Sequence, residues 1–205
     1  MKTVLVLLAG VLLGILATVL GGWLYMNHVM ATIAELPQAV PLDVKGRVEK
    51  SRLAYRDAKD EYGRWLALTD GVIWSVDVDP PAKAREDANT VLSVAEKYRS
   101  DWNYGNAVHK ANLALGRLAL RDGDIEQAKH YLIEAGKTPG SPQLNSFGPN
   151  MLLAKELVEK GETAAVLEYL DLCAKFWRSD FGSVSTWKKL IAEGKQPNFL
   201  ANLLY

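Results

Sequence analysis

The fold is decided by residues 103–135, which read NYGNAVHKANLALGRLALRDGDIEQAKHYLIEA. Apolar and small residues recur every three or four positions on both sides of Asp122-Gly123-Asp124, a spacing typical of amphipathic helices. Asp124 can cap the second helix while Gln127, three residues later, reaches back to it, as in a capping box. The stretch therefore predicts two antiparallel helices, the first ending at about Arg121.

This stretch resembles the tetratricopeptide repeat, which has a Leu-Gly pair in its first helix and two alanines around a large apolar residue in its second. The matching residues here are Leu115, Gly116, Ala128, Leu132 and Ala135. The family usually has a tryptophan and a tyrosine where this chain has Asn112 and Ala119. The resemblance implies helix pairs that meet closely at Gly116 and Ala128.

A second copy is predicted at residues 153–173, LAKELVEKGETAAVLEYLDLC, which match residues 115–135 at an offset of 38 positions. Both copies have glycine in the turn between their helices. A divergent first unit is expected from a helix over 44–66 paired with a helix over 82–99, and one more helix over 184–193 precedes a tail that folds back. The fold class predicted for the chain is all-α, with antiparallel helix pairs stacked as a short solenoid similar to tetratricopeptide repeats, preceded by one transmembrane helix.

The N-terminal segment is long and apolar, with no charge between Lys2 and Glu35. Twenty-four helical residues, 3–26, would span about 36 Å, which exceeds the ~30 Å hydrocarbon thickness of a membrane. A cleaved signal peptide is the rival interpretation, but its apolar region is normally only about 7–15 residues long. We expect an uncleaved anchor at 1–27, a proline-containing spacer at 28–43 and a helical domain at 44–205.

The flanking charges predict the orientation of this anchor. Lys2 lies on the short side, and the other flank has no lysine or arginine before Lys45, which favours a cytoplasmic N-terminus in the inner membrane of a bacterium. The helical domain would then be extracytoplasmic. Small residues recur every four positions within the anchor and would allow a second helix, from another copy or a partner, to approach closely. These residues are Gly10, Gly14, Thr18 and Gly22.

Composition excludes several classes of function. Lysine plus arginine equals aspartate plus glutamate at 24 each, which argues against a nucleic-acid partner. The one cysteine, Cys173, permits no intrachain disulfide and is expected to be a small core residue. No metal-binding spacing, phosphate loop, dinucleotide fingerprint or nucleophile elbow occurs, so no cofactor, metal or catalytic residue is predicted.

The segment 138–151, TPGSPQLNSFGPNM, joins the two predicted repeats. As a connector, it would place Pro149 at the first position of the next helix and Phe147 in the groove of the repeats. As a contact site, its polar side chains would receive an anionic group of a partner beside that helix. With Trp74 as an aromatic anchor, the candidate partner-binding residues are Asn145, Ser146, Phe147, Asn150 and Trp74.

These expectations favour a membrane-anchored scaffold or adaptor that acts through protein–protein contacts, because a repeat stack offers an extended binding surface. The alternative is a helical enzyme or enzyme subunit with a site in the 67–81 loop or the 138–151 loop.

Overall fold

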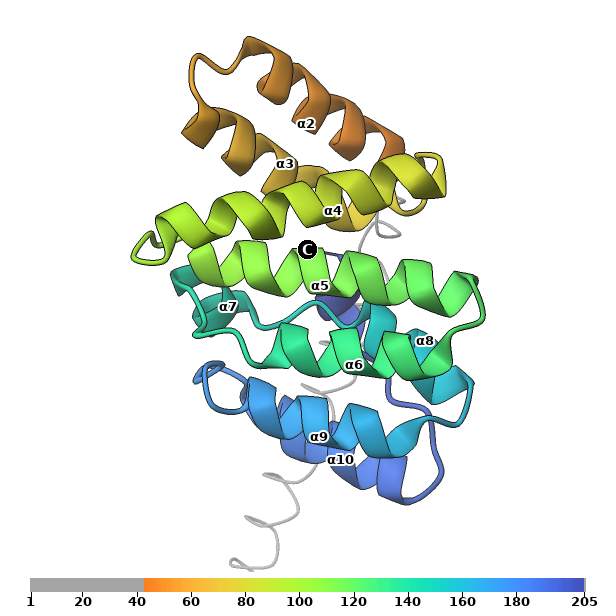
Figure 1. Ribbon diagram of the computed structural model, residues 1–205. Coiled ribbons are helices and arrows are strands. Elements are labelled where there is room, and N and C mark those ends of the chain that lie inside the picture. The colour runs from red at the N-terminus through yellow and green to blue at the C-terminus, as the bar shows by residue number, and fades with distance from the viewer. Residues whose placement is uncertain (1–42, 205) are drawn as a thin grey trace, which may run out of the picture. The chain divides into compact units, whose positions relative to one another are not determined.

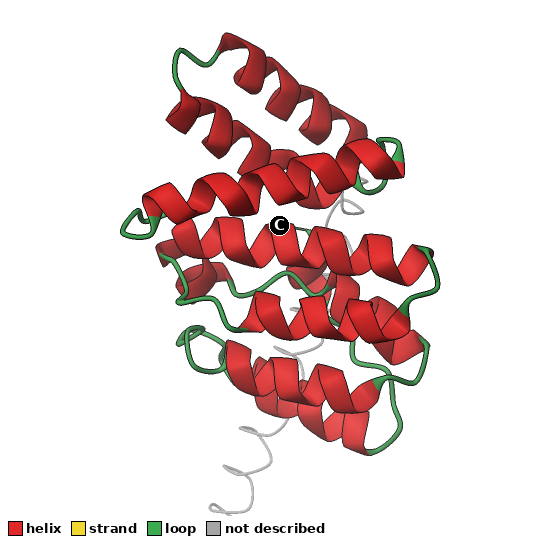
Figure 2. Ribbon diagram, viewed as in Figure 1, coloured by secondary structure: helices red, strands yellow, loops and turns green. Residues whose placement is uncertain are grey.

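The computed structural model describes residues 43–204, which form one compact unit made of helices without a strand (Figure 2). The all-α class is therefore confirmed for this part of the chain. The α-helices are α2 Val44–Asp57, α3 Glu61–Ser75, α4 Pro81–Ala95, α5 Tyr104–Arg121, α6 Ile125–Gly136, α7 Pro142–Phe147, α8 Leu152–Glu159, α9 Thr163–Cys173 and α10 Ser183–Ala192. Two 3₁₀ turns, η1 Glu96–Tyr98 and η2 Leu200–Leu203, complete the set.

The predicted anchor 1–27, with its stripe of small residues, and the spacer up to residue 42 lie outside the described residues. Between Asp43 and Leu204, none of the helices combines the length and apolarity that a membrane crossing requires.

Helix α5 lies at the centre of the described unit (Figure 1). It packs against α3 and α4 on one side and against α6, α7 and α8 on the other. The hairpin α2–α3 lies at one end, and α9 with α10 at the other end beyond α6. Most of α5 is buried because its small and apolar residues cover most of its circumference.

The turn between α5 and α6 is capped by Asp124, whose carboxylate accepts a hydrogen bond from the Gln127 backbone N–H at 3.0 Å. Gly123 has φ = 84°, a left-handed conformation that glycine adopts without strain. The expected reciprocal half of the capping box is not formed. The Asp124 backbone N–H donates to the Ala119 carbonyl at 2.9 Å instead.

The turn between α8 and α9 has the same hydrogen bonds 38 positions later. Glu162 N–H donates to the Leu157 carbonyl at 3.0 Å, and Gly161, with φ = 84°, donates to Val158 at 2.9 Å. The corresponding donors in the first turn are Asp124 and Gly123. This equivalence concerns one turn, and the tetratricopeptide resemblance stays a prediction.

The helix expected over 44–66 is wrong, because the chain breaks after Asp57. Ala58 is extended, and Asp60 begins α3 by accepting a hydrogen bond from the Gly63 N–H at 2.7 Å. The apolar spacing continues across this break without a glycine or proline, so periodicity alone does not reveal it.

The loop expected over 67–81 is also wrong over most of its length, since α3 continues to Ser75. Trp74 and Val76 are both buried, and a short turn up to Asp79 leads into α4. The first helix pair is consequently α2–α3, not 44–66 with 82–99. Pro80 and Pro81 mark the start of α4, as predicted, with Pro80 at the N-cap and Pro81 as the first helical residue.

The C-terminal tail folds back onto the unit, as expected from its apolar residues, but only part of it is buried. Phe199 is 1% exposed and packs edge-on against Trp187 at a ring distance of 5.0 Å. Leu200 and Leu204 remain exposed. Cys173 is fully buried, which agrees with the predicted core role, and burial raises the pKa of its thiol.

Candidate functional site

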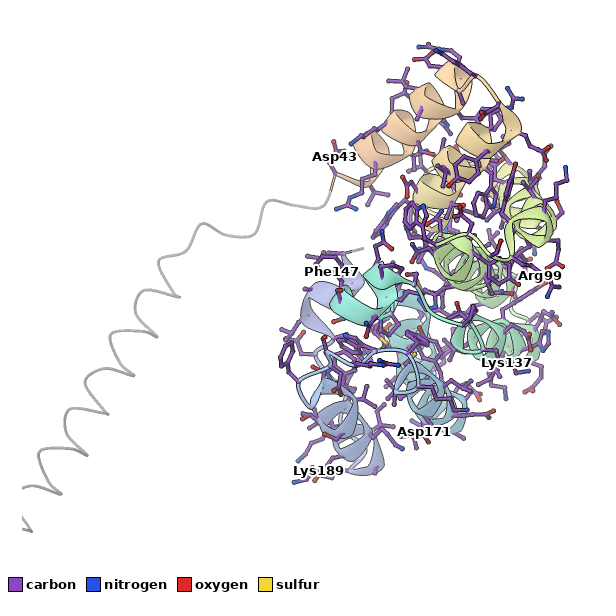
Figure 3. All side chains as sticks on the ribbon, turned by 90° about the vertical axis from the view of Figure 1, so that its left-hand side faces the viewer. Asp43, Arg99, Lys137, Phe147, Asp171 and Lys189 are labelled. Atoms are coloured by element: carbon purple, nitrogen blue, oxygen red, sulfur yellow. The ribbon has the colours of Figure 1, made fainter. Side chains whose placement is uncertain are left out.

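A cleft of about 550 Å³ opens between the hairpin α2–α3, the first half of α5 and the segment 138–151. Figure 3 shows Phe147 and Asp43, where α2 begins, on one edge of the molecule, opposite Arg99 and Lys137. Three of the five predicted partner-binding residues line this cleft, namely Trp74, Phe147 and Asn150. The cleft therefore joins residues that lie far apart in the sequence.

The segment 138–151 contains the short helix α7 and is fastened to α5. The Thr138 hydroxyl donates to the Gly105 carbonyl at 2.8 Å. A side chain on Gly105 would lie 1.8 Å from the Gly140 carbonyl oxygen, so only glycine permits this approach. Ser141 caps α7 by accepting a hydrogen bond from the Leu144 N–H at 3.0 Å.

The C-terminal tail holds the same segment from its other side. The Asn202 side chain donates to the carbonyls of Pro149 at 2.9 Å and Phe147 at 3.2 Å. The Met151 N–H donates back to the Asn202 carbonyl at 2.8 Å. The expected helix start at Pro149 is wrong, because these bonds keep residues 148–151 outside a helix and α8 begins at Leu152.

The predicted residues Asn145 and Ser146 do not line the cleft. The Asn145 side-chain oxygen accepts a hydrogen bond from the Arg178 backbone N–H at 3.1 Å, which fastens α7 to the loop after α9. Phe147 lies at the rim of the cleft and is 60% exposed, so the expectation that it is tucked into a groove is wrong.

Asn150 is 2% exposed and stabilises the wall of the cleft. Its side-chain oxygen accepts from the Leu152 N–H at 2.9 Å, and its carbonyl accepts from the Tyr169 hydroxyl at 3.0 Å. These bonds satisfy buried backbone groups where the chain enters α8. Asn150 therefore fixes the backbone that forms this part of the cleft wall.

His109 lies at the base of the cleft with both ring nitrogens engaged. Nδ1 lies 3.1 Å from the Ala135 carbonyl and donates to it, and Nε2 accepts from the Asn150 N–H at 3.2 Å. Burial, outweighing the bond to Ala135, lowers the pKa of His109 to about 4, so the ring is neutral at pH 7. Because its lone pair is occupied, His109 positions the segment 138–151 and is not available as a base.

Three carboxamides form a network at one end of the cleft. The Asn106 NH₂ group donates to the side-chain oxygens of Asn103 at 2.8 Å and Gln143 at 3.2 Å. The Asn106 oxygen accepts from the Ser141 hydroxyl at 2.6 Å. This arrangement uses the oxygens of Asn103 and Gln143 within the protein and leaves their NH₂ groups as donors for the cleft.

Basic side chains dominate the charged lining. Arg47, Lys50 and Lys110 line the cleft, and Asp70 is its one carboxylate among the described residues. Lys110 Nζ lies 3.6 Å from a carboxylate oxygen of Asp70, whose side chain is 77% exposed. Burial lowers the pKa of the Lys110 ammonium, an effect that Asp70 opposes.

Aromatic rings occupy both the wall and the rim. Trp74 is 3% exposed, and the Arg47 guanidinium lies 5.1 Å from its ring centre, a cation–π contact. At the rim, Trp102 is 51% exposed and Phe147 is 60% exposed. Large aromatic side chains that stay accessible beside a polar cleft are the type that anchors protein partners.

Most of the polar residues that line the cleft were not predicted from the sequence. Asn106 and Lys110 interrupt the apolar surface of α5, and Asn103 directly precedes this helix. Polar residues on a helix that is otherwise buried are a usable signal. Arg47 and Lys50 carried no such signal, because they lie on the polar face of a terminal helix.

Comparisons with protein-family models, with curated proteins and with solved structures found no match. Within residues 43–204, no group of three histidine, cysteine, aspartate or glutamate side chains is arranged to hold a metal ion.

Proposed function

We propose that this chain is a membrane-anchored adaptor that holds a protein partner in the cleft between α2–α3, α5 and the segment 138–151. The observation that carries the proposal is the combination of outward-facing amide NH₂ groups with accessible rings at the rim. Amides bind extended backbone, while rings bind the partner's apolar side chains. His109, the histidine of the cleft, uses both ring nitrogens to hold the cleft together.

The finer parts of the proposal come from the sequence. The domain would be a short solenoid of the tetratricopeptide type, and residues 1–27 would anchor it in the inner membrane with the cleft on the extracytoplasmic side. The equivalent turns after α5 and α8 support related helix pairs. The long uncharged run before Glu35 supports the anchor.

Site-specific photo-crosslinking in cells that produce the full-length chain tests this function. A photoreactive phenylalanine analogue at Phe147 or Trp102 should crosslink to one defined protein. The same analogue at Lys160, which is exposed at the end of α8 and does not line the cleft, should not. Equal crosslinking from all three positions, or from none, would show that the cleft is not the binding surface.

A further inference from the structure

We propose that the partner segment in this cleft is an acidic peptide, with carboxylates that bind Lys110, Lys50 and Arg47 and with an apolar side chain between the rim aromatics. This inference rests on the proposed function and specifies the chemistry of its ligand. It arises from the polar lining of the cleft, where three cations and the NH₂ groups of Asn103 and Gln143 are donors and Asp70 is the one carboxylate among the described residues.

The carboxamides at one end of the cleft are oriented as donors. Because Asn106 donates to the oxygens of Asn103 and Gln143, the NH₂ groups of these two neighbours are left for other partners. Among the described residues, neither NH₂ group has an acceptor within hydrogen-bond distance. A ligand that pairs with these groups would bring acceptor oxygen atoms to this end of the cleft.

The charged lining of the cleft is mostly basic. Three basic side chains face one carboxylate, although the whole chain is balanced at 24 charges of each sign. Helix α2 itself carries Lys45, Arg47, Lys50, Arg52 and Arg56 against Glu49 and Asp57. The excess of basic residues is thus local. Acidic residues on a partner would attract the partner to the cleft and fix the register in which it binds.

Lys110 is the most enclosed of the three cations. Its side chain is 23% exposed and its carboxylate neighbour, Asp70, is held at 3.6 Å and faces mostly water. A carboxylate brought into the cleft would compensate the burial of this ammonium better than Asp70 does. Asp70 would then compete with the ligand for Lys110.

A peptide fits these features better than a nucleic acid. The rim rings Trp102 and Phe147 provide apolar contact beside the cations, and the outward amides can pair with backbone carbonyls. A nucleic-acid site would normally extend the basic surface beyond the cleft to reach successive phosphates. Two of the further basic residues of α2 are already paired, Arg52 with Asp79 and Arg56 with Asp57, which limits such an extension.

An array of decapeptides, probed with the full-length protein in detergent micelles, tests the inference. The peptides contain zero to five glutamates and one tryptophan or leucine at varied positions, and each has a twin with glutamine in place of glutamate. Binding should increase with glutamate content, and the best acidic peptide should bind at least about tenfold more tightly than its twin, as expected for several charge-assisted contacts.

Variants locate the effect in the cleft. Lys110→Met should weaken the best peptide at least about fivefold, whereas Asp70→Asn should strengthen it about two- to fivefold by removing the competitor. Lys160→Met, outside the cleft, is the matched control and should leave binding unchanged. Circular dichroism of each variant separates loss of binding from loss of folding.

Several results would overturn the inference. Signals independent of glutamate content, or equal effects of Lys110→Met and Lys160→Met, would show that these cations do not select the ligand. Tighter binding of a ten-nucleotide RNA than of the best peptide would assign the cleft to nucleic acid. If Phe147 crosslinks a protein but acidic peptides do not bind, the adaptor function stands and the acidic chemistry is wrong. If Phe147 crosslinks nothing, the function itself is wrong.

Discussion

The hairpins α2–α3 and α5–α6 are built alike but contribute differently to the molecule. Each has two antiparallel helices, and an aspartate caps the second, Asp60 in one hairpin and Asp124 in the other. Helix α5 buries 14 of its 18 residues, whereas α2 buries only Val48 and Ser51. The same local design therefore yields a core helix in one place and an exposed helix in the other.

The difference shows how stability and recognition are divided. Helix α5 contacts α3, α4, α6, α7 and α8. A substitution that disturbs its packing should therefore destabilise the whole unit. Helix α2 packs mainly against α3, with Ser51 Oγ donating to the Ala67 carbonyl at 2.6 Å, and its basic residues remain available to the cleft. Substitutions at the buried positions of α5 should mainly alter the free energy of unfolding, whereas those at the cations that line the cleft, Arg47 and Lys50 on α2 and Lys110 on α5, should mainly alter binding.

The largest effect is expected where Arg117 connects α5 to the turn after α3 and to α8. Its guanidinium pairs with Asp77 at 2.9 Å and with Glu156 at 2.8 Å, and its side chain is 6% exposed. Arg117→Met should lower the free energy of unfolding by about 3–4 kcal/mol, because Glu156 loses this buried cation and Asp77 keeps the more exposed Arg121. Urea denaturation measures this change. Arg121→Met, at a more exposed cation beside the same Asp77, should cost at most about 1 kcal/mol.

If Arg117→Met were as mild as Arg121→Met, the ion pairs would not connect α5 to its neighbours. The conclusion that α5 contributes most to the stability of the unit would then lose its main support.

A pH effect of similar size is expected from His109 on α5. Its pKa is lowered from 6.5 to about 4 in the folded protein, so the unfolded chain takes up a proton first as the pH falls. The contribution of His109 to the free energy of unfolding is fully present above pH 6.5. It decreases between pH 6.5 and 4, by about 3 kcal/mol in total. Unfolding free energies measured across this range check the prediction.

His109→Gln is the control, because glutamine can donate to Ala135 and accept from Asn150 without titrating. The variant should lose the extra slope between pH 6.5 and 4. An unchanged slope would mean that other groups cause the acid sensitivity.

The sequence predicted the second hairpin better than the first for physical reasons. At Asp122-Gly123-Asp124, a glycine with positive φ and a capping aspartate mark the turn directly. At Ala58-Lys59-Asp60, the one signal is the cap, and apolar periodicity runs through the break. Trp74 and Val76 alternate with polar neighbours and therefore resemble a strand, although they belong to the end of α3 and the turn after it.

The candidate site was predictable only in part. Phe147, Asn150 and Trp74 could be proposed from residue type and position, and they do line one cleft. Their joint position depends on the packing of α3 against α5 and on the tail, through Asn202, and no local pattern encodes either. Lys110 could not be assigned to the cleft without knowing which face of α5 remains accessible.

A smaller effect is expected at Gly116, where α5 meets two helices at once. A Cβ here would lie 2.3 Å from Leu153 Cδ2 and 3.3 Å from the Ala128 carbonyl oxygen. Gly116→Leu should overpack this junction and cost about 1–3 kcal/mol in thermal or urea unfolding. Gly116→Ala should cost less, since the nearest atom is the end of a flexible side chain. Equal stability of the leucine variant and the native chain would contradict the packing described.

The smallest effects are expected from substitutions of the capping aspartates, which allow the two hairpins to be compared directly. Asp60 and Asp124 each accept one backbone hydrogen bond, at 2.7 and 3.0 Å. Asp60→Ala and Asp124→Ala should therefore each lower the free energy of unfolding by about 1 kcal/mol. The two sites share no partner, so the double variant should show the sum within about 0.5 kcal/mol.

An Asp60→Ala variant as stable as the native chain would show that packing alone fixes the break after α2. The cap at Asp60 would then be incidental, and the likeness of the two hairpins would be only geometric. A loss at Asp60 that equals the loss at Asp124 would instead show that a single aspartate sets the turn in both hairpins. In that case the cap, which the sequence displays at both places, is the better guide to helix boundaries in this chain than apolar periodicity.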